Sequence, residues 1–378
     1  MINSRVKRIS FNNFNWFIAE HHEGVIQLAQ AELLSGNYIR SNTVEHLEDR
    51  LATLCERKYA VTTASCTDAL FFALSASGIG PGDEVILPAF SYIASVTPII
   101  RCGAIPVFAD ICHDTLMLDI DSVRKAITPK TKAIIFVQLF GNCIEYEPIL
   151  ELANQKKILL IEDAAQAIGS LYKNKPGGSF GDISCMSFDP TKIISAFATG
   201  GILLTDNPDI YHKTLSLSHH GRNEQGKFNT LGYNSKLSSI SAGLINLQLD
   251  YMEDTLKKYR SIAQRYVSNL KDNVHIEAVI PREDITPTFH KFVVKTKARD
   301  LLKKHLTEHN IESKIHYNPL LYEHPLISKY KHIVHSCPVA RKTKMQVLSL
   351  PIHTGLSMDE INHICDTINK FTKVLHKK

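Results

Sequence analysis

Two segments of the chain carry side chains that could perform covalent chemistry, and both follow apolar, strand-like runs. Asp163 comes directly after the run 158–162, and Gln166 lies three residues further on. Lys192 comes shortly after the run 183–187 and precedes a stretch of small residues that ends at Gly200-Gly201. Burial among apolar residues depresses the pKa of a lysine, which leaves part of its amine neutral and nucleophilic toward an aldehyde.

Each of these residues also has an ordinary structural explanation. A single lysine is usually a solvated surface charge, because lysine is rarely buried without a partner. An aspartate at a strand end more often caps a helix than performs catalysis. A nucleophilic amine and a carboxylate together nevertheless suit pyridoxal phosphate, because that cofactor stabilises a carbanion only while its ring nitrogen stays protonated. The sequence therefore predicts that Lys192 forms a Schiff base and that Asp163 faces the ring nitrogen.

Both segments belong to a region in which apolar runs alternate with helix-like stretches. The candidate strands are 59–63, 84–87, 105–109, 132–138, 158–162, 183–187 and 202–205. The candidate helices between them are 68–76, 91–101, 122–126 and 146–155. This alternation predicts a mostly parallel sheet with crossover helices, whose ligands bind at the carboxyl ends of the strands. Asp163 and Lys192 both lie at such ends.

The pattern changes after residue 205. Residues 241–271 are predicted to be helical almost throughout, 289–294 and 315–317 to be strands, and 358–376 to be a helix. We therefore expect an α/β protein with a large domain over 1–250 and a small C-terminal α+β domain over 251–378. The large domain would hold a mixed, mostly parallel seven-stranded sheet flanked by helices.

Composition excludes several other classes of protein. The 378 residues are 44% hydrophobic and 21% charged, as in ordinary globular proteins, and the net charge of +5 is dispersed, which argues against nucleic acid as a partner. Residues 1–17 lack the apolar core of a secretory signal, and no apolar run is long enough to span a membrane. The eight cysteines show no CxxC spacing, and no HExxH occurs, so we expect no metal site and a cytoplasmic location.

A series of short motifs extends along nearly the whole chain. They are Ser35-Gly36-Asn37-Tyr38-Ile39, Ala64-Ser65-Cys66-Thr67-Asp68-Ala69-Leu70, Pro81-Gly82-Asp83-Glu84-Val85-Ile86, Pro88-Ala89-Phe90-Ser91-Tyr92, the Asp163 and Lys192 segments, Gly232-Tyr233-Asn234-Ser235-Lys236-Leu237 and Leu348-Ser349-Leu350-Pro351. Each is weak alone, but their joint order resembles the DegT/DnrJ/StrS family of nucleotide-sugar aminotransferases. The resemblance implies the aspartate-aminotransferase-like fold type I and the cofactor pyridoxal phosphate.

The resemblance also implies roles at the cofactor ring. Lys192 is the Schiff-base lysine and the base that moves a proton at the reacting carbon, while Asp163 holds the pyridine nitrogen. Gln166 hydrogen-bonds the phenolic oxygen, and Tyr92 stacks on the ring, although core packing is an equally ordinary place for a tyrosine.

Further matched residues concern the cofactor's phosphate. The backbone amides of Cys66 and Thr67, at the start of a helix, bind that phosphate, and Ser187 adds a hydroxyl. Asn234 reaches the phosphate of the neighbouring subunit, which implies a homodimer with two shared active sites. A turn asparagine is the structural alternative for Asn234.

Some residues depart from the family pattern. Cys66 stands where most relatives have glycine, Gln138 where histidine is frequent, Asp189 where histidine or tyrosine is usual, and Thr199 where an acid is common. We expect the last three to lie near the sugar pocket. The loop from Lys192 to Gly201 is one residue longer than in perosamine-type enzymes, and Asn234-Ser235-Lys236-Leu237 replaces their Asn-Tyr-Arg, as in the subgroup that aminates 3-keto-6-deoxy sugars.

The expected reaction transfers the amino group of L-glutamate to a nucleotide-linked keto sugar, with a dTDP-linked 3-keto-6-deoxyhexose favoured. The alternatives are a 4-keto sugar of the perosamine or viosamine type, a UDP-linked 3-keto sugar, or a cyclitol ketone. Sugar dehydratases of this fold resemble the chain but have histidine at the position of Lys192. A non-catalytic regulatory homologue would be expected to lose Lys192, Asp163 or Gln166, and the sequence retains all three.

Overall fold

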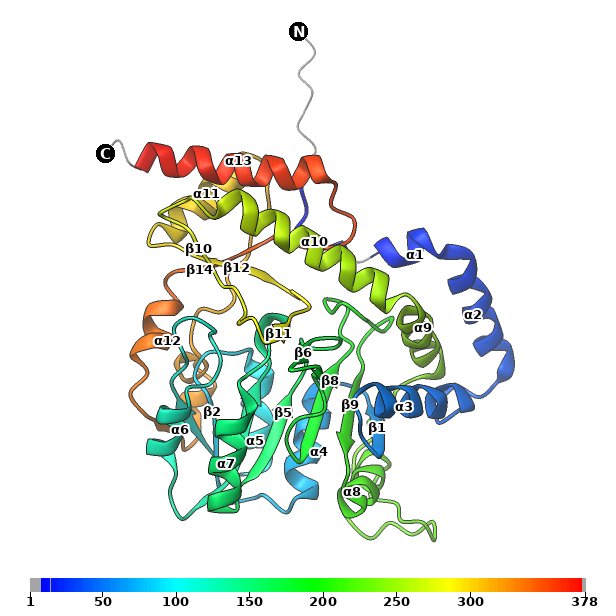
Figure 1. The fold of residues 1–378 in the computed structure, drawn as a ribbon. Helices are drawn as coiled ribbons and strands as arrows, with labels where there is room; N and C mark the ends of the chain where they lie inside the picture. Colours follow the sequence, from blue (N-terminus) through cyan, green and yellow to red (C-terminus); the bar gives the residue numbers. More distant parts are fainter. Residues whose placement is uncertain (1–7, 14, 376–378) are drawn as a thin grey trace.

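A large sheet lies at the centre of the computed structural model, which describes residues 8–13 and 15–375 (Figure 1). Two expectations fall partly outside these ranges. They concern the segment 1–17, in which no secretory signal was expected, and His376, the last residue of an expected helix. The strand order is β1-β9-β8-β5-β4-β2-β3-β13, and β9 is antiparallel to both of its neighbours while the other pairs are parallel.

All seven strands expected from the sequence are present in this sheet, so the expected α/β fold class is confirmed. Their bounds are β1 (Tyr59–Thr63), β2 (Glu84–Pro88), β3 (Ile105–Ala109), β4 (Thr131–Val137), β5 (Leu159–Asp163), β8 (Ile183–Ser187) and β9 (Gly201–Thr205). The C-terminal part of the chain adds an eighth, two-residue strand, β13 (Ile333–Val334), at the edge next to β3.

Helices cover the faces of this sheet (Figure 1). They are α3 (Asn42–Leu54), α4 (Cys66–Ala76), α5 (Thr97–Arg101), α6 (Ile120–Ala126), α7 (Tyr146–Lys156) and α8 (Pro208–Ser218), with the 3₁₀ turns η1 (Ile93–Ser95) and η2 (Leu139–Gly141). The helix expected over 91–101 is wrong in its first half, where only η1 forms. Helix α5 starts afresh at Thr97 with Pro98 in its first turn, a position where the missing proline N–H costs nothing.

Two helices replace the single one expected over 241–271. They are α9 (Ser239–Asp250) and α10 (Met252–Leu270), and the chain leaves helical geometry at Tyr251, whose ring lies 4.1 Å from that of His21. The N-terminal helices α1 (Trp16–Glu20) and α2 (His22–Ser35) lie beside α9 (Figure 1). The break coincides with the predicted domain boundary after residue 250, and the division into two domains itself stays a prediction.

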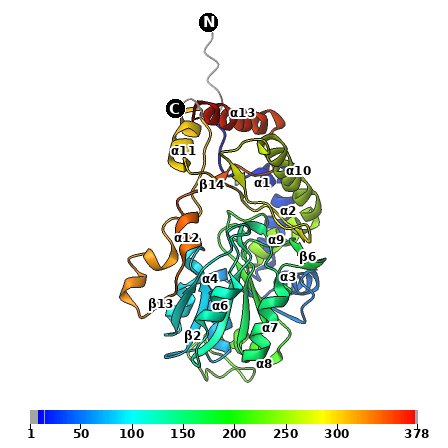
Figure 2. The same cartoon turned by 60° about the vertical axis from the view of Figure 1, so that its left-hand side comes forward.

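The C-terminal residues build a second layer above the large sheet (Figures 1 and 2). A small antiparallel sheet has the order β10 (Glu277–Ala278), β12 (Phe292–Lys295), β14 (Val347–Leu350), and helices α10, α11 (Arg299–Glu308) and α13 (Met358–Leu375) lie around it. Strand β11 (Ile285–Thr286) instead joins β6 (Leu171–Tyr172) and β7 (Lys175–Pro176) from the large part of the chain. The remaining elements of this region are η3 (Leu321–Glu323), η4 (Ile327–Lys329) and α12 (Pro338–Thr343).

The strand expected at 315–317 is wrong. Only the preceding residue, Lys314, pairs with β14, through an isolated bridge to Ser349. The chain turns at His316 and Tyr317 and continues into Asn318-Pro319, where proline has no N–H to donate to a strand ladder. This turn brings His316 and Tyr317 toward the large sheet.

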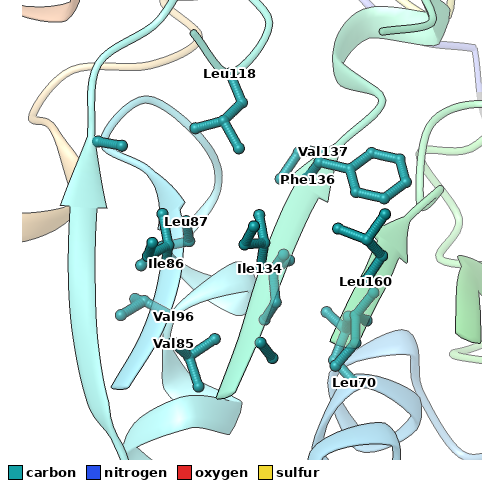
Figure 3. Close-up of a cluster of buried hydrophobic side chains, with 14 of the residues drawn as sticks. Leu70, Val85, Ile86, Leu87, Val96, Leu118, Ile134, Phe136, Val137 and Leu160 are labelled. Carbon is teal, nitrogen blue, oxygen red and sulfur yellow. The ribbon is translucent and has the colours of Figure 1, made fainter. Parts of the chain in front are cut away.

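The interior of the large sheet is almost wholly apolar (Figure 3). Ile134 and Phe136 of β4 are fully buried between β2 and β5, and Leu160 of β5 lies beside them. A strand that is buried on both faces lacks the alternation of an exposed strand, which is why these runs are continuously apolar in the sequence. The rigid centre fixes the strand ends from which the polar residues project.

We expect Leu160→Ala to lower the free energy of unfolding by about 2–5 kcal/mol, because the substitution leaves a cavity in a close-packed core. Urea denaturation of the cofactor-free protein measures this change. Leu301→Ala on α11 is the matched control, because Leu301 is 58% exposed and its truncation should shift stability by about 0.5 kcal/mol or less. Equal effects of the two substitutions would contradict the assignment of Leu160 to the core.

Candidate active site

A cavity of about 450 Å³ opens where β1, β4, β5 and β8 end, between the large sheet and the C-terminal layer. It is the site at which a parallel sheet of this kind binds ligands. Its lining includes Cys66, Thr67, Tyr92, Ser95, Asp163, Gln166, Ser187, Asp189, Lys192, Thr199, His290, Lys291, Lys314, His316 and Tyr317. Seven of the eight site residues expected from the sequence therefore meet in one place.

Asp163 ends β5, and its carboxylate is buried in the floor of the cavity. Oδ2 accepts a hydrogen bond from the hydroxyl of Ser95 at 2.8 Å, and Oδ1 accepts one from the amide of Ala165 at 3.2 Å. Burial raises the pKa of Asp163, and these two donors and the nearby Lys192 oppose that rise. A cationic ring nitrogen at this carboxylate would favour its ionised form further.

Lys192 lies on a loop whose ends are tied together. The amide of Phe188 donates to the carbonyl of Gly200, and the loop is fastened to α9 by Gln248, which bonds both the amide and the carbonyl of Ser195. Burial lowers the pKa of Lys192, and among the described residues none forms a hydrogen bond or ion pair with its Nζ. The amine is thus held in the cavity in a state suited to nucleophilic attack.

The start of α4 forms a cradle for an anion. Ser65 caps the helix by accepting from the amide of Asp68, and the amides of Cys66 and Thr67 have no partner within the described ranges. Unpaired amides and the helix dipole favour a phosphate at such a position. Gly201 lies against this turn so closely that a Cβ on it would be 2.3 Å from the nitrogen of Cys66.

Tyr92, Gln166 and Ser187 line the cavity as expected. Tyr92 is 57% exposed, so it is not a core residue. The amide oxygen of Gln166 accepts from the backbone of Phe140 at 2.8 Å, and its nitrogen donates to the hydroxyl of Tyr317 at 3.2 Å. These bonds fix the orientation of the Gln166 amide at the cavity wall.

Two expected residues lie elsewhere. Asn234 is exposed, bonds to Lys236 and does not line this cavity, so its role toward a neighbouring subunit stays a prediction. Gln138 does not line the cavity, but its backbone amide donates to the carbonyl of Asp163, so its expected place near the sugar pocket stays a prediction. Gln138 is fully buried, and its side chain donates to Glu162 at 3.0 Å and accepts from the amide of Ile144 at 2.7 Å. Asp189 and Thr199 do line the cavity.

Several residues of the site were not expected from the sequence. Ser95, Tyr317 and the basic residues His290, Lys291, Lys314 and His316 all line the cavity. The signal was present at 290–291 and 314–316, where polar residues interrupt or adjoin apolar runs that we treated only as strands. Ser95 carried no separate signal, because it fell inside an expected helix.

Outside the cavity, the structure bears on metal ligands, cysteines and membrane-spanning helices. In the described part of the chain, the one group with metal-binding geometry is His113, Asp114 and Glu277, which are all exposed. All eight cysteines are free thiols. Among the residues that the structure describes, no helix is both long and apolar enough to cross a membrane.

Comparisons with known proteins agree with this geometry. The family described as the DegT/DnrJ/EryC1/StrS aminotransferase family matches residues 20–369. A UDP-2-acetamido-2-deoxy-3-oxo-D-glucuronate aminotransferase of Pseudomonas aeruginosa is 33% identical, over 89% of this chain and 92% of its own. A dTDP-3-amino-3,4,6-trideoxy-alpha-D-glucose transaminase of Streptomyces venezuelae is 32% identical over 90% and 89%. A "pleiotropic regulatory protein" of Geobacillus stearothermophilus is also 32% identical, over 92% and 94%.

Solved structures show the same similarity. S. venezuelae DesV, in complex with a ketimine intermediate, has a TM-score of 0.94 and 31% identity, covering 97% of this chain and 99% of its own. The PLP form of the putative sugar aminotransferase Spr1654 from Streptococcus pneumoniae has a TM-score of 0.86 and 29% identity, over 93% and 96%.

Fold, site and comparisons together define a pyridoxal-phosphate-dependent transaminase. The chain belongs to the DegT/DnrJ/EryC1/StrS aminotransferase family, as its motifs indicated, and is an aminotransferase of nucleotide-linked sugars. The donor set in the cavity fits the cofactor, because it offers an unpartnered lysine amine, a buried carboxylate and the free amides at the start of α4.

We expect Gly201→Ala to weaken pyridoxal phosphate binding at least about tenfold, because the new Cβ must displace the amides that face the phosphate. A titration followed by cofactor absorbance measures the dissociation constant. Gly24→Ala is the matched control, since its Cβ would meet only Leu247 at an ordinary 3.8 Å. Unchanged affinity in Gly201→Ala would show that the start of α4 does not hold the phosphate.

Proposed function

We propose that the chain transfers the amino group of L-glutamate to the ketone of a nucleotide-linked 3-keto-6-deoxy sugar, with dTDP as the favoured nucleotide. The observation that carries the proposal is the meeting of Lys192 and Asp163 in one cavity at the strand ends. The relative from S. venezuelae supports a dTDP-linked amino sugar as the product, and the longer loop between Lys192 and Gly201 supports position C3.

Pyridoxal phosphate, when bound, supplies an electron sink that stabilises negative charge at the carbon losing a proton. Lys192 would hold the cofactor's aldehyde carbon through its amine, and its Nζ would act as the base that moves the proton at the donor's reacting carbon. A pKa lowered by burial suits this role, because the amine must accept a proton near neutral pH.

Asp163 would keep the ring nitrogen protonated, and Ser95 positions Asp163. The hydroxyl of Ser95 lies between Asp163 and Ser91, at 2.8 and 2.9 Å, so the carboxylate is held in one orientation. The amides of Cys66 and Thr67 would bind the phosphate together with the hydroxyl of Ser187.

Tyr92 and Gln166 would orient the cofactor ring. The exposed ring of Tyr92 offers a face for stacking, and Gln166 would reach the phenolic oxygen with its second amide hydrogen.

We further propose a homodimer with shared active sites. Asn234 is exposed at the end of a loop that also carries Phe228 and Leu231, which are 69% and 80% exposed. Apolar side chains grouped on a surface loop support contact with a second subunit.

The eight free thiols support a reducing compartment, and we propose the cytoplasm.

A specific observation favours one second candidate. The relative from G. stearothermophilus is named a regulatory protein, so a regulatory role is the alternative from another class. The retention of Lys192, Asp163 and Gln166 in one cavity favours catalysis. Amination at C4, or of a UDP-linked sugar, remains the alternative within the enzyme class.

We expect the wild-type protein with pyridoxal phosphate to show a visible absorption band that L-glutamate abolishes, and Lys192→Ala to lack both properties. Turnover of Lys192→Ala should fall at least about 10³-fold, as expected for loss of a general base. Lys175→Ala, at an exposed lysine, is the control. Turnover with dTDP- and UDP-linked 3-keto and 4-keto sugars then tests the acceptor. A band in Lys192→Ala that responds normally to glutamate would refute the assignment.

We expect Ser95→Ala to reduce kcat about tenfold, because loss of a hydrogen bond to a buried carboxylate raises the pKa of Asp163 further and weakens its hold on the ring nitrogen. Steady-state kinetics with saturating cofactor measures the change. Ser268→Ala on α10, at an exposed serine, should have wild-type kinetics. An unchanged kcat in Ser95→Ala would show that the hydrogen bond from Ser95 to Asp163 does not contribute to catalysis.

A further inference from the structure

Two lysines lie over the same aromatic ring at the edge of the active cavity. Lys291 Nζ lies 5.3 Å and Lys314 Nζ 5.1 Å from the centre of the Phe11 ring. Phe11 is only 2% exposed, and the ring of His316 lies 5.7 Å away. Both lysines line the cavity that also contains Lys192. We call them the lysine pair.

The backbone fixes the position of both lysines. Lys291 directly precedes β12, and its amide bonds to the carbonyl of Phe140. Lys314 is joined to β14 by two backbone hydrogen bonds with Ser349, at 2.8 and 3.2 Å. The backbone is therefore anchored at both positions, with Lys291 buried and Lys314 exposed at the edge of the cavity.

Lys291 lacks a counter-charge. It is 8% exposed, and across the ranges that the structure describes no residue forms a hydrogen bond or ion pair with its Nζ, which contacts the face of the Phe11 ring. Burial, together with the charges of Lys192 and Lys314, lowers the pKa of Lys291 to about 7, and Asp189 opposes this only partly. A buried lysine without a partner is unfavourable, and such groups concentrate at functional sites.

The nearest carboxylates have other partners. Glu312 accepts from the amide of Phe11 at 2.8 Å and pairs with Arg8. Asp189 accepts from the amide and hydroxyl of Thr191, at 2.9 and 2.6 Å. Asp163 is bonded to Ser95 and Ala165. The lysine pair therefore faces the cavity with an excess of positive charge.

We infer that the lysine pair is a carboxylate subsite, which holds a carboxylate of the substrate whose reacting carbon lies beside Lys192. The inference rests on the proposed transamination. The phosphate of the cofactor already has donors at the start of α4, so the lysine pair is left for a different anion. Two substrates could supply a carboxylate: a dicarboxylic amino donor such as L-glutamate, or a nucleotide-linked keto sugar with an acid group.

The test compares equilibrium binding and half-reaction kinetics of the holoenzyme. Glutarate, an unreactive dicarboxylate, is titrated by calorimetry, and the rate at which L-glutamate abolishes the visible band is measured against its concentration. Lys291→Met should weaken glutarate binding, and raise the half-saturating glutamate concentration, about tenfold. The limiting rate should change less than about threefold, since Lys192 still performs the chemistry.

Matched variants separate charge from packing. Lys291→Arg keeps the charge and should bind glutarate nearly as well as the wild type. Lys314→Met should have a smaller effect than Lys291→Met, because Lys314 is exposed. Lys304→Met, at a lysine that is 76% exposed on α11, should match the wild type. A fall in the limiting rate of Lys291→Met with unchanged glutarate binding would overturn the inference.

The second half-reaction, in which the amino group passes to the keto sugar, identifies which substrate supplies the carboxylate. If glutarate and glutamate are unaffected but Lys291→Met weakens an acidic UDP-linked keto sugar more than its neutral counterpart, the subsite serves the sugar. If neither substrate is affected, the inference is wrong. Glutarate binding that depends on Lys291 in a protein unable to transaminate glutamate would instead leave the subsite standing and refute the proposed function.

Binding should also depend on pH. Lys291 carries its charge below its pKa of about 7 and loses it above, so glutarate should bind the wild type more tightly at pH 6 than at pH 8. The groups that face Lys291 are Lys192, Lys314, Asp189, His290, His316 and His353. Burial lowers the pKa of His316 to about 3 and that of His290 well below its usual range, so neither titrates in this interval. Lys291→Arg should abolish this change in glutarate affinity between pH 6 and pH 8. A change that persists in the variant would assign the pH dependence to another titrating group.

Discussion

A carboxylate buried at the end of a central strand must be hydrogen-bonded, and the active cavity depends on that constraint. Strand β5 ends in two adjacent acids, Glu162 and Asp163, which point to opposite faces because side chains alternate along a strand. Asp163 faces the cavity and is bonded by Ser95 and the amide of Ala165. Glu162 faces inward and is bonded by the amides of Gly178 and Phe180 and by Gln138. One strand end thus supplies both the carboxylate of the cavity floor and a second, fully bonded carboxylate that ties the strand to the neighbouring loop.

The hydrogen bond between Gln138 and Glu162 explains why a glutamine at position 138 is compatible with activity. Gln138 follows β4, next to β5, and its amide satisfies Glu162 on one side and the amide of Ile144 on the other. A side chain that can both donate and accept suits this place, because both neighbouring groups are buried. The residue therefore supports the wall of the cavity and does not contact its contents.

The distribution of positive charge gives the cavity two distinct sides. The helix start at Cys66 and Thr67 offers neutral backbone donors, whereas the C-terminal layer contributes Lys291 and Lys314. Lys192 lies in the same cavity, and burial lowers the pKa of both Lys192 and Lys291. For Lys192 the cause is burial alone, whereas the charges of Lys192 and Lys314 lower the pKa of Lys291 further.

The sequence by itself determined the α/β class, all seven principal strands and the residues Asp163 and Lys192, because apolar periodicity and strand ends are local properties of the chain. Ordered motifs added Cys66, Thr67, Tyr92, Gln166 and Ser187, which the fold brings into one cavity. Only the tertiary structure decided the partners of these residues. Ser95 bonds to Asp163 across 68 positions of the sequence, and Phe11 meets lysines at 291 and 314. The first contact depends on how η1 packs against the end of β5 and the second on how the C-terminal layer packs on the sheet, and no local pattern encodes either packing. The same reason accounts for the turn at His316 and Tyr317, which a short apolar run had made resemble a strand.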